Sequence, residues 1–467
     1  GLFFNAKARR AVYVVLPPED AKEGMCGRLL KSLYGTRDAA RNWEEEYSTY
    51  LQTIGFIRGV SSPSVFYHPT REIRVVVHGD DFTCLGWRGQ LLWLRGEMAK
   101  QYEIKHELIG PGSSDGKSVR ILNRVLVWTE RGMELEPDQR HGELIVKYSG
   151  LDRKAKAVTS PGERRAFEDR EEHLELDRSE SKRYRAIIAR ANYMSTERSD
   201  VQYSVKELSR FMAIPRTCDW TNVKRLARYL LGKPRTVLVY GYQQKQQFLE
   251  TWTDTDFAGC RSERKSTSGG LIMHGSHCLK SWSSTQSIIA GSTGEAEYYG
   301  LVKGGSNSLG MRALMEDLGV GGVKLRLKSD ASAAIGIASR RGLGEIRHLE
   351  VSQLWLQQKV ANGDLELIKV NGEDNLADAL TKHLGAGDLQ RHMVGVGLEE
   401  REGRHDIMPE VAQDGEEEYA VQMGPGEDED GHTLEAIQFG NGREKGLEPP
   451  RTFAGKWEHC RFPGIVS

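Results

Sequence analysis

The sequence predicts a multidomain chain of the α+β and α/β classes. Its 467 residues are enough for two or three domains that each bury a core. Residues 1–110 alternate strand-like and helix-like stretches, and residues 184–233 show helical periodicity. Residues 235–385 return to strands interleaved with helices. That order predicts a mixed sheet with flanking helices in the last of these regions.

The first region contains one predicted helix between predicted strands. Residues 11–16 form an apolar stretch that Pro17 and Pro18 would stop. Residues 37–54 carry apolar side chains three or four positions apart, which predicts a helix. Residues 73–78 are apolar and largely β-branched. They predict a strand that turns through Gly79-Asp80-Asp81 into a hairpin partner at 82–87.

The rest of the chain follows a helical and then a mixed pattern. Residues 111–117 predict a loop, and residues 155–185 are charge-rich and partly linker-like. Helices are predicted at 184–196, 201–211, 220–231, 294–317 and 347–361, with a last helix opening at residue 374. Strands are predicted at 236–242, 247–254, 269–273, 278–282, 323–328 and 365–370.

Charge is distributed unevenly around a net value of −1. Residues 386–467 carry 18 acidic and 8 basic side chains and predict a disordered acidic tail, which leaves residues 1–385 with a net charge of +9. A basic body fits a nucleic-acid binder.

The six cysteines include no CxxC pair, which favours a reducing compartment over a zinc site or disulfides. We expect no membrane span, because no stretch of about 20 apolar residues occurs. We also expect no signal peptide, and a fragment or processed product, because the chain opens at Gly1 without a basic and apolar leader.

Asp80 and Asp81 are the first candidate metal ligands. Two adjacent carboxylates at a hairpin tip repel each other unless a cation lies between them, and Mg²⁺ is the cation that bridges phosphates in polymerases. The alternative is an ordinary Gly-Asp-Asp turn, since glycine and aspartate are common turn formers.

Residues 31–43, KSLYGTRDAARNW, resemble the LYGLKQAPRAW segment of reverse transcriptases from copia-type LTR retrotransposon Pol polyproteins. Residues 78–81 stand where that family has YVDD, and motifs across 191–230 are similar to its connector. The resemblance implies a truncated reverse transcriptase palm at 1–110 and a thumb/connector at 111–234. It also implies metal ligands at Asp80 and Asp81. The implied template and nucleotide region contains Tyr34, Gly35, Arg37 and Arg41.

The polymerase part departs from the family at four places. The family's third metal-binding aspartate would precede Gly1, and its YV is His78-Gly79 here. In its KQAP segment, the Gln is Asp38 and the Pro is Ala40. Loss of one of three metal carboxylates should cripple polymerisation. We therefore expect RNA-directed DNA polymerase activity to be absent from this chain alone.

Residues 235–385 resemble the ribonuclease H domain of the same family. TDTDFAG at 253–259, STGEAEY at 292–298, SDASAAI at 329–335 and NLADALTK at 375–382 resemble SDADWAG, STTEAEY, CDNQSAI and NLADILTK. The resemblance implies that the catalytic, metal-binding carboxylates are Asp254, Glu297, Asp330 and Asp378. Asp256 and Glu295 are nearby alternatives that the motif register disfavours, and Asp374 is interpreted as a helix N-cap.

Four carboxylates of this kind could hold two Mg²⁺ ions about 3.5–4 Å apart, with Mn²⁺ as a substitute, and hydrolyse RNA in an RNA–DNA hybrid. Short polar and basic side chains near them are candidate contacts to sugars and phosphates. The alternative for each is an ordinary solvated side chain. The candidates are Arg264, Lys265, Ser266, Thr267, Ser283, Gln286, Arg347 and His348.

The expected function is a retrotransposon polymerase/ribonuclease H fragment that retains ribonuclease H activity. The alternative is a decayed or domesticated nucleic-acid-binding relic without catalysis. The expected partners are an RNA–DNA hybrid, an RNA template with a DNA primer, and the missing upstream Pol region. The expected location is intracellular, in cytoplasmic virus-like particles or the nucleus.

Overall fold

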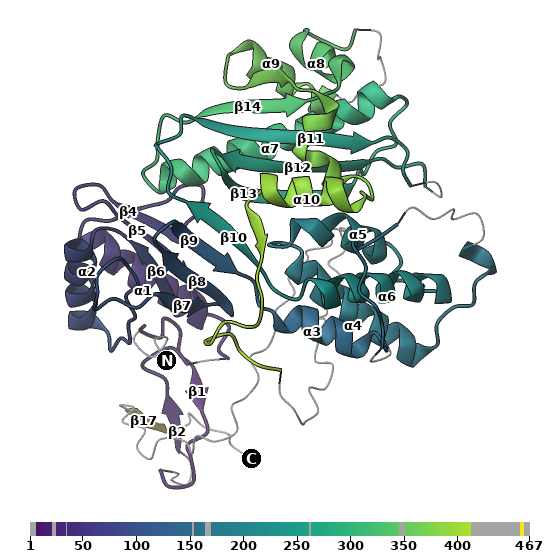
Figure 1. Cartoon of the computed structure of the whole chain (residues 1–467). Helices are drawn as coiled ribbons and strands as arrows, with labels where there is room; N and C mark the ends of the chain where they lie inside the picture. The colour runs from purple at the N-terminus through teal and green to yellow at the C-terminus, as the bar shows by residue number, and fades with distance from the viewer. Residues whose placement is uncertain are drawn as a thin grey trace, which may run out of the picture. The chain divides into compact units, whose positions relative to one another are not determined.

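The computed structural model describes residues 6–20, 25–33, 35–151, 154–163, 170–260, 263–344, 351–411 and 458–461. It combines helices with four sheets among these residues, as the predicted mixed class requires (Figure 1). Two compact units lie within residues 1–106, 313–321 and 440–467 (unit 1), and within 107–312 and 322–439 (unit 2). None of the described helices is both long and apolar enough to cross a membrane.

Unit 1 contains an antiparallel sheet in the order β3-β4-β5-β6 with two helices. Ile73, Val75 and Val77 are buried while Val76 is exposed, so one face of β5 packs into a core with Trp43 and its neighbours on α1. The predicted helix at 37–54 and the predicted hairpin are confirmed. The bounds are β3 (Ile57–Arg58), β4 (Val65–His68), β5 (Ile73–His78), β6 (Asp81–Leu85), α1 (Ala39–Thr53) and α2 (Arg88–Gln101).

A second small sheet in unit 1 has the order β1-β2-β17, with β1 (Tyr13–Val14), β2 (Met25–Arg28) and β17 (Glu458–Arg461). The strand predicted at 11–16 is therefore only two residues long.

Unit 2 begins with an antiparallel sheet in the order β16-β10-β9-β8-β7. The strand predicted at 236–242 is present as β10, but it pairs with β9 and β16 rather than with the strands that follow it. Helix α10 and strand β16 lie at the start of the segment predicted to be a disordered tail. That prediction is therefore wrong for residues 386–400, which are folded. Residues 412–457 of the same segment are outside the described part. The bounds are β7 (Ser118–Ile121), β8 (Arg124–Thr129), β9 (Gly132–Glu136), β10 (Thr236–Gly241), α10 (Ala386–Gly395) and β16 (Leu398–Glu400).

Four helices of unit 2 share one apolar core. Tyr184, Ile188, Val205 and Leu226 are among its fully buried members. The three helices predicted between 184 and 231 are confirmed, and a fourth precedes them. They are α3 (Arg140–Tyr148), α4 (Arg178–Met194), α5 (Ser199–Ser209) and α6 (Thr217–Gly232).

The remaining sheet of unit 2 is mixed, as predicted for the region after 235, and has the order β13-β12-β11-β14-β15. Strands β11, β12 and β13 are antiparallel, whereas β14 and β15 run parallel to β11. Figure 1 shows α7 behind this sheet and α10 in front of it. The bounds are β11 (Phe248–Asp256), β12 (Thr267–His274), β13 (His277–Thr285), α7 (Thr293–Asp317), β14 (Lys324–Ser329), α8 (Ser332–Ser339), α9 (Trp355–Ala361) and β15 (Glu366–Lys369).

Candidate metal centre

Glycines bring α7 unusually close to β11. A Cβ atom at Gly300 would lie 2.6 Å from Thr255 Oγ1, and one at Gly304 would lie 2.6 Å from Thr253 Cγ2. Both distances are below any normal contact, so the helix backbone rests directly on the strand. Glu297 lies one turn before Gly300 and is thereby held beside the end of β11.

Asp254, Glu297 and Asp330 converge at one edge of the mixed sheet. One carboxylate oxygen of each lies within 4.8 Å of the others. Two of the acids meet because β11 and β14 are parallel neighbours in which Trp252 pairs with Lys328, so Asp254 and Asp330, each two positions further along, lie at the same end of the two strands. Opposite oxygen ligands of one Mg²⁺ are about 4.2 Å apart, so the spacing is close to that of a metal site.

Burial makes the charges of this cluster costly. Asp254 and Glu297 are 7% and 6% exposed. Burial, and then the neighbouring carboxylates, raises the pKa of Glu297 to about 9. Burial also raises the pKa of Asp254 to about 6, opposed by a hydrogen bond from Thr381 Oγ1. One oxygen of Glu297, Oε2, is buried and has no hydrogen-bond partner among the described residues. A divalent cation would stabilise all three carboxylates in their charged form, so these residues fit a metal ion.

Asp378 lies near the cluster but outside the group of three. It belongs to a short 3-10 helix, η5 (Leu376–Leu380), and forms an ion pair of 2.8 Å with Lys382. Its charge contributes to the raised pKa of Asp254, which shows that the two acids are close enough to interact.

Asn375 fixes η5 against β11. Its Nδ2 donates to the carbonyl of Thr253 at 3.0 Å, and its Oδ1 accepts from the backbone N–H of Ala377 at 3.1 Å. Asn375 is therefore the N-cap, and the prediction that Asp374 caps this helix is wrong: Asp374 is exposed and ends the preceding turn.

Glu295, the alternative acid on α7, has a structural role. It is 1% exposed and accepts hydrogen bonds from Tyr299 Oη at 2.9 Å and from the backbone N–H of Gly291 at 2.8 Å. Its oxygens are occupied within the protein, whereas Glu297 has an oxygen close to the other two acids and its Oε2 lacks a hydrogen-bond partner among the described residues. Asp256, the alternative on β11, is not part of the cluster of three.

Three of the predicted nucleic-acid contacts are buried within the scaffold. Ser266 Oγ accepts from the backbone N–H of Ala258 at 3.1 Å, and Gln286 Nε2 donates to the carbonyl of Ala296 at 2.8 Å. Thr267 Oγ1 accepts from Lys206 Nζ at 2.6 Å. These side chains join strands and helices to one another in this structure.

The other predicted contacts are more accessible or lie outside the described residues. Arg264 is exposed, Lys265 pairs with Glu263 at 3.1 Å, and Ser283 is half-buried. Arg347 and His348 are among the residues that the structure does not describe.

Asp80 and Asp81 lie at the tip of the β5–β6 hairpin in unit 1. Gly79 makes the turn with a φ of 61°, and Trp43 Nε1 donates to its carbonyl at 3.0 Å, which ties the tip to α1. Asp81 is exposed and Asp80 half-buried. Within the described residues, no third acid joins them in a potential metal-binding group.

The predicted template and nucleotide region precedes and opens α1. Gly35 (φ of 87°), Arg37 and Arg41 are exposed, and Arg41 pairs with Glu45 at 3.3 Å on the same helix. Tyr34 lies outside the described residues.

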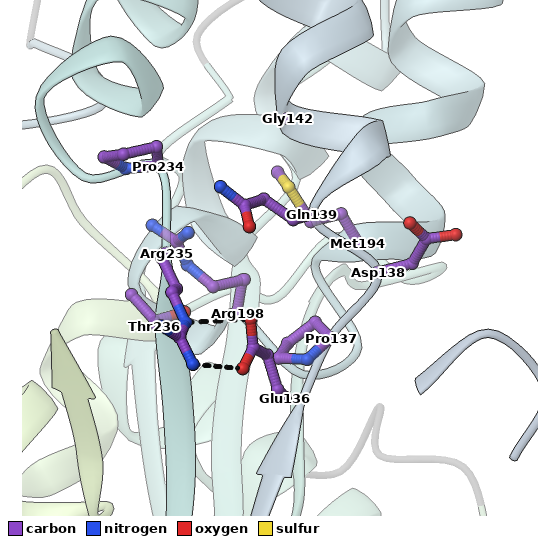
Figure 2. A pocket seen from close by; sticks show the side chains of 10 residues that line it. All are labelled: Glu136, Pro137, Asp138, Gln139, Gly142, Met194, Arg198, Pro234, Arg235 and Thr236. Carbon is purple, nitrogen blue, oxygen red and sulfur yellow. Dashed lines mark hydrogen bonds and ion pairs between the residues drawn. The ribbon is translucent and has the colours of Figure 1, made fainter. Parts of the chain in front are cut away.

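A small cavity in unit 2 lies between β9, α3 and the start of β10 (Figure 2). Arg235 spans it with two bonds to Glu136, of 3.0 and 2.9 Å, and Arg198 beside it pairs with Asp200 at 2.7 Å. These charges are paired within the protein, and no predicted site residue lines the cavity.

The chain resembles curated Pol polyproteins over most of its length, although no protein-family model matches it. It is 26% identical over 396 residues to the retrovirus-related Pol polyprotein from transposon TNT 1-94 of Nicotiana tabacum, covering 80% of the chain and 28% of the relative. The corresponding protein from transposon RE2 of Arabidopsis thaliana is 27% identical over 414 residues, covering 85% and 27%. The transposon Ty1-H Gag-Pol polyprotein of Saccharomyces cerevisiae is 22% identical over 399 residues, covering 82% and 22%.

The chain spans about a quarter of the length of these relatives. The matches agree with the resemblance found in the sequence motifs. The chain is therefore similar, over four fifths of its length, to part of the Pol polyproteins of copia-type retrotransposons.

Proposed function

We propose that unit 2 contains a ribonuclease H-like domain that hydrolyses the RNA strand of RNA–DNA hybrids. The observation that carries the proposal is the convergence of Asp254, Glu297 and Asp330 at the carboxyl edge of β11 and β14. The mixed sheet, with α7 packed directly on its central strand, supports the same assignment.

Asp254, Glu297 and Asp330, with Asp378 beside them, would hold Mg²⁺, for which Mn²⁺ could substitute. Bound there, the ions would lower the pKa of an attacking water and stabilise the leaving 3′-oxygen. The protein's own part is to orient the ligands. Thr381 donates to Asp254, and Glu297 is fixed by the contact of α7 with β11. Without a cation, the raised pKa of Glu297 keeps a proton on its carboxyl, which must leave when a cation binds.

We propose that residues 1–110 are a truncated reverse transcriptase palm and residues 111–234 its thumb/connector. Asp80 and Asp81 would be metal ligands there, and a template, a primer and the upstream Pol region its partners. Two acids without a third in the described part of unit 1 do not support polymerisation by this chain alone. A cytoplasmic or nuclear site of action follows from the same proposal.

A nucleic-acid-binding relic is the second candidate. The observation that favours it is the ion pair between Asp378 and Lys382, which neutralises the fourth acid without a metal ion.

Cleavage of a labelled RNA–DNA hybrid by the full chain tests the two candidates. We expect Mg²⁺-dependent cleavage that EDTA stops and that Asp330→Asn abolishes, since the amide removes a charged ligand without changing shape. A folded chain that binds the hybrid and leaves it intact at every Mg²⁺ concentration would establish the relic instead.

A further inference from the structure

Two lysines, Lys280 and Lys303, line the contact between α7 and the edge strand β13. Lys303 Nζ, on α7, donates to Ser284 Oγ on β13. Lys280 Nζ, on β13, donates to Asn307 Oδ1 on α7 at 2.8 Å. These four side chains, Lys280, Ser284, Lys303 and Asn307, are called the lysine seam here.

No carboxylate of the described residues forms an ion pair with the two lysines of the seam. Among the described residues, neither Lys280 nor Lys303 lies within ion-pair distance of a carboxylate, whereas on β14 Lys328 pairs with Glu250 at 2.8 Å. Lys303 is half-buried, and burial followed by the charge of Lys280 lowers its pKa. Partly desolvated cations are normally paired, so an external anion would stabilise this seam.

The seam extends away from the candidate metal centre. Lys303 follows Glu297 by six residues on the same helix, a rise of about 9 Å. On the sheet, Ser284 pairs with Ser268, and Ser268 pairs with Thr255, the residue after Asp254. Ser284 is thus two strand spacings, about 10 Å, from the strand that carries Asp254. A nucleic-acid strand carries a phosphate about every 3.4 Å of helix axis, so a substrate at the metal centre has phosphates at this range.

We propose that the lysine seam binds backbone phosphates of the nucleic acid held at the metal centre, two to three nucleotides from the scissile bond. Ser284 and Asn307 each accept one hydrogen bond from an ammonium group, which leaves further N–H donors on each lysine that would bind the phosphates. The proposal rests on the proposed function for its substrate, and it adds an interaction that the sequence motifs do not contain.

Binding of a fluorescein-labelled RNA–DNA hybrid tests the seam without requiring cleavage. The full chain carrying Asp330→Asn is titrated by fluorescence anisotropy at KCl concentrations from about 50 to 200 mM. The double variant of the seam, Lys280→Met/Lys303→Met, is compared with a control double variant, Lys245→Met/Lys324→Met. The second pair removes the same charge from two exposed lysines near the start of β11 and β14, at the other end of the sheet.

We expect the seam variant to bind more weakly and the slope of log affinity against log salt to flatten by about 2, because each substituted lysine would no longer neutralise a phosphate. The control pair should leave the slope unchanged. Equal slopes in the two variants, with circular dichroism showing both folded, would overturn the proposal. Inorganic phosphate is the second probe: if it raises the melting temperature of the parent but not of the seam variant, while the hybrid slopes agree, the seam takes a free anion instead.

The outcome is separable from that of the nuclease assay. If the salt slope depends on the seam but the chain never cleaves, the seam is supported as a binding site and the proposed nuclease is refuted. If the chain cleaves but the two lysine pairs give equal salt slopes, the nuclease is supported and the seam is refuted.

Discussion

Glu297→Gln should stabilise the metal-free protein while abolishing cleavage. The substitution keeps the size of the side chain and removes a carboxyl group that is buried beside Asp254 and Asp330. Because the folded protein holds the pKa of Glu297 at about 9, against an ordinary value of 4.5, folding at neutral pH costs the free energy of keeping this carboxyl protonated.

The sign and size of the effect follow from the two pKa values. Below pH 4.5 the carboxyl is protonated in both the folded and the unfolded chain and contributes no pH dependence. Between pH 4.5 and about 9 only the unfolded chain releases the proton, so stability falls as pH rises. At pH 7 the cost has an upper limit of about 3 kcal/mol, at about 1.4 kcal/mol per pH unit. Since Asp254 shares the repulsion, we expect the variant to gain about 1–3 kcal/mol.

Hydrogen–deuterium exchange of the α7 and β11 amides is the suitable assay, because a chain of two units does not unfold in one step. The free energy of opening is measured in EDTA from pH 5 to pH 8.5, and then with Mg²⁺. The parent should lose protection as pH rises and regain it with Mg²⁺, whereas the variant should show a weaker dependence on both.

Glu295→Gln is the matched control, two residues away on the same helix. Its carboxylate accepts from Tyr299 Oη and the Gly291 N–H, whereas a neutral amide has only one acceptor oxygen for these two donors, so we expect a loss of about 1–3 kcal/mol. The reasoning would be refuted if Glu297→Gln destabilised the metal-free protein as Glu295→Gln does. It would also be refuted if opening of the parent were independent of pH.

Substitutions at Gly304 and His392 test how the centre is held, and one at Asp81 tests whether it acts alone. Gly304→Val would push α7 off Thr253, so we expect overpacking to destabilise the fold by about 1–3 kcal/mol. The Mg²⁺ concentration that cleavage requires should rise, as measured by titrating cleavage with Mg²⁺. An unchanged Mg²⁺ requirement would refute the close-packing argument. His392 is buried, and its Nδ1 lies 2.9 Å from the Leu376 carbonyl. His392→Phe should therefore loosen η5 and raise the Mg²⁺ concentration that cleavage requires. His392→Asn, which retains a donor, should raise it less. Asp81→Asn should leave hybrid cleavage unchanged, and a loss of cleavage there would show that the two acidic sites act together.

Helices and strands with strong internal periodicity could be predicted from the sequence, and their partners could not. The pattern of residues 236–242 specifies a strand but not its neighbours, and β10 pairs with β9, which lies about a hundred residues earlier. The Gly- and Glu-rich composition after residue 385 indicated disorder, yet Leu389 and Met393 are spaced to bury one face of α10. An average over a long segment concealed a short amphipathic helix.

The acids of the candidate site were identified by motif register, but their supports were not. Gly300 and Gly304 look like helix-weakening residues until the close contact with β11 is seen. Ser266 and Gln286 look like polar donors for a ligand, yet both are buried and bonded within the protein. Sequence identifies the kind of polar group, whereas only packing determines whether it faces solvent.

The two acidic sites differ in what they cost the folded protein. Asp81 lies exposed at a hairpin tip, where water solvates its charge and the turn requires no cation to exist. Glu297 is buried beside two other acids, and one of its oxygens lacks a partner among the described residues. A glutamine there would give a more stable metal-free fold, so stability alone does not account for this glutamate. The proposed binding of a divalent cation would account for it, because a cation would turn the repulsion among the three carboxylates into attraction to a common centre.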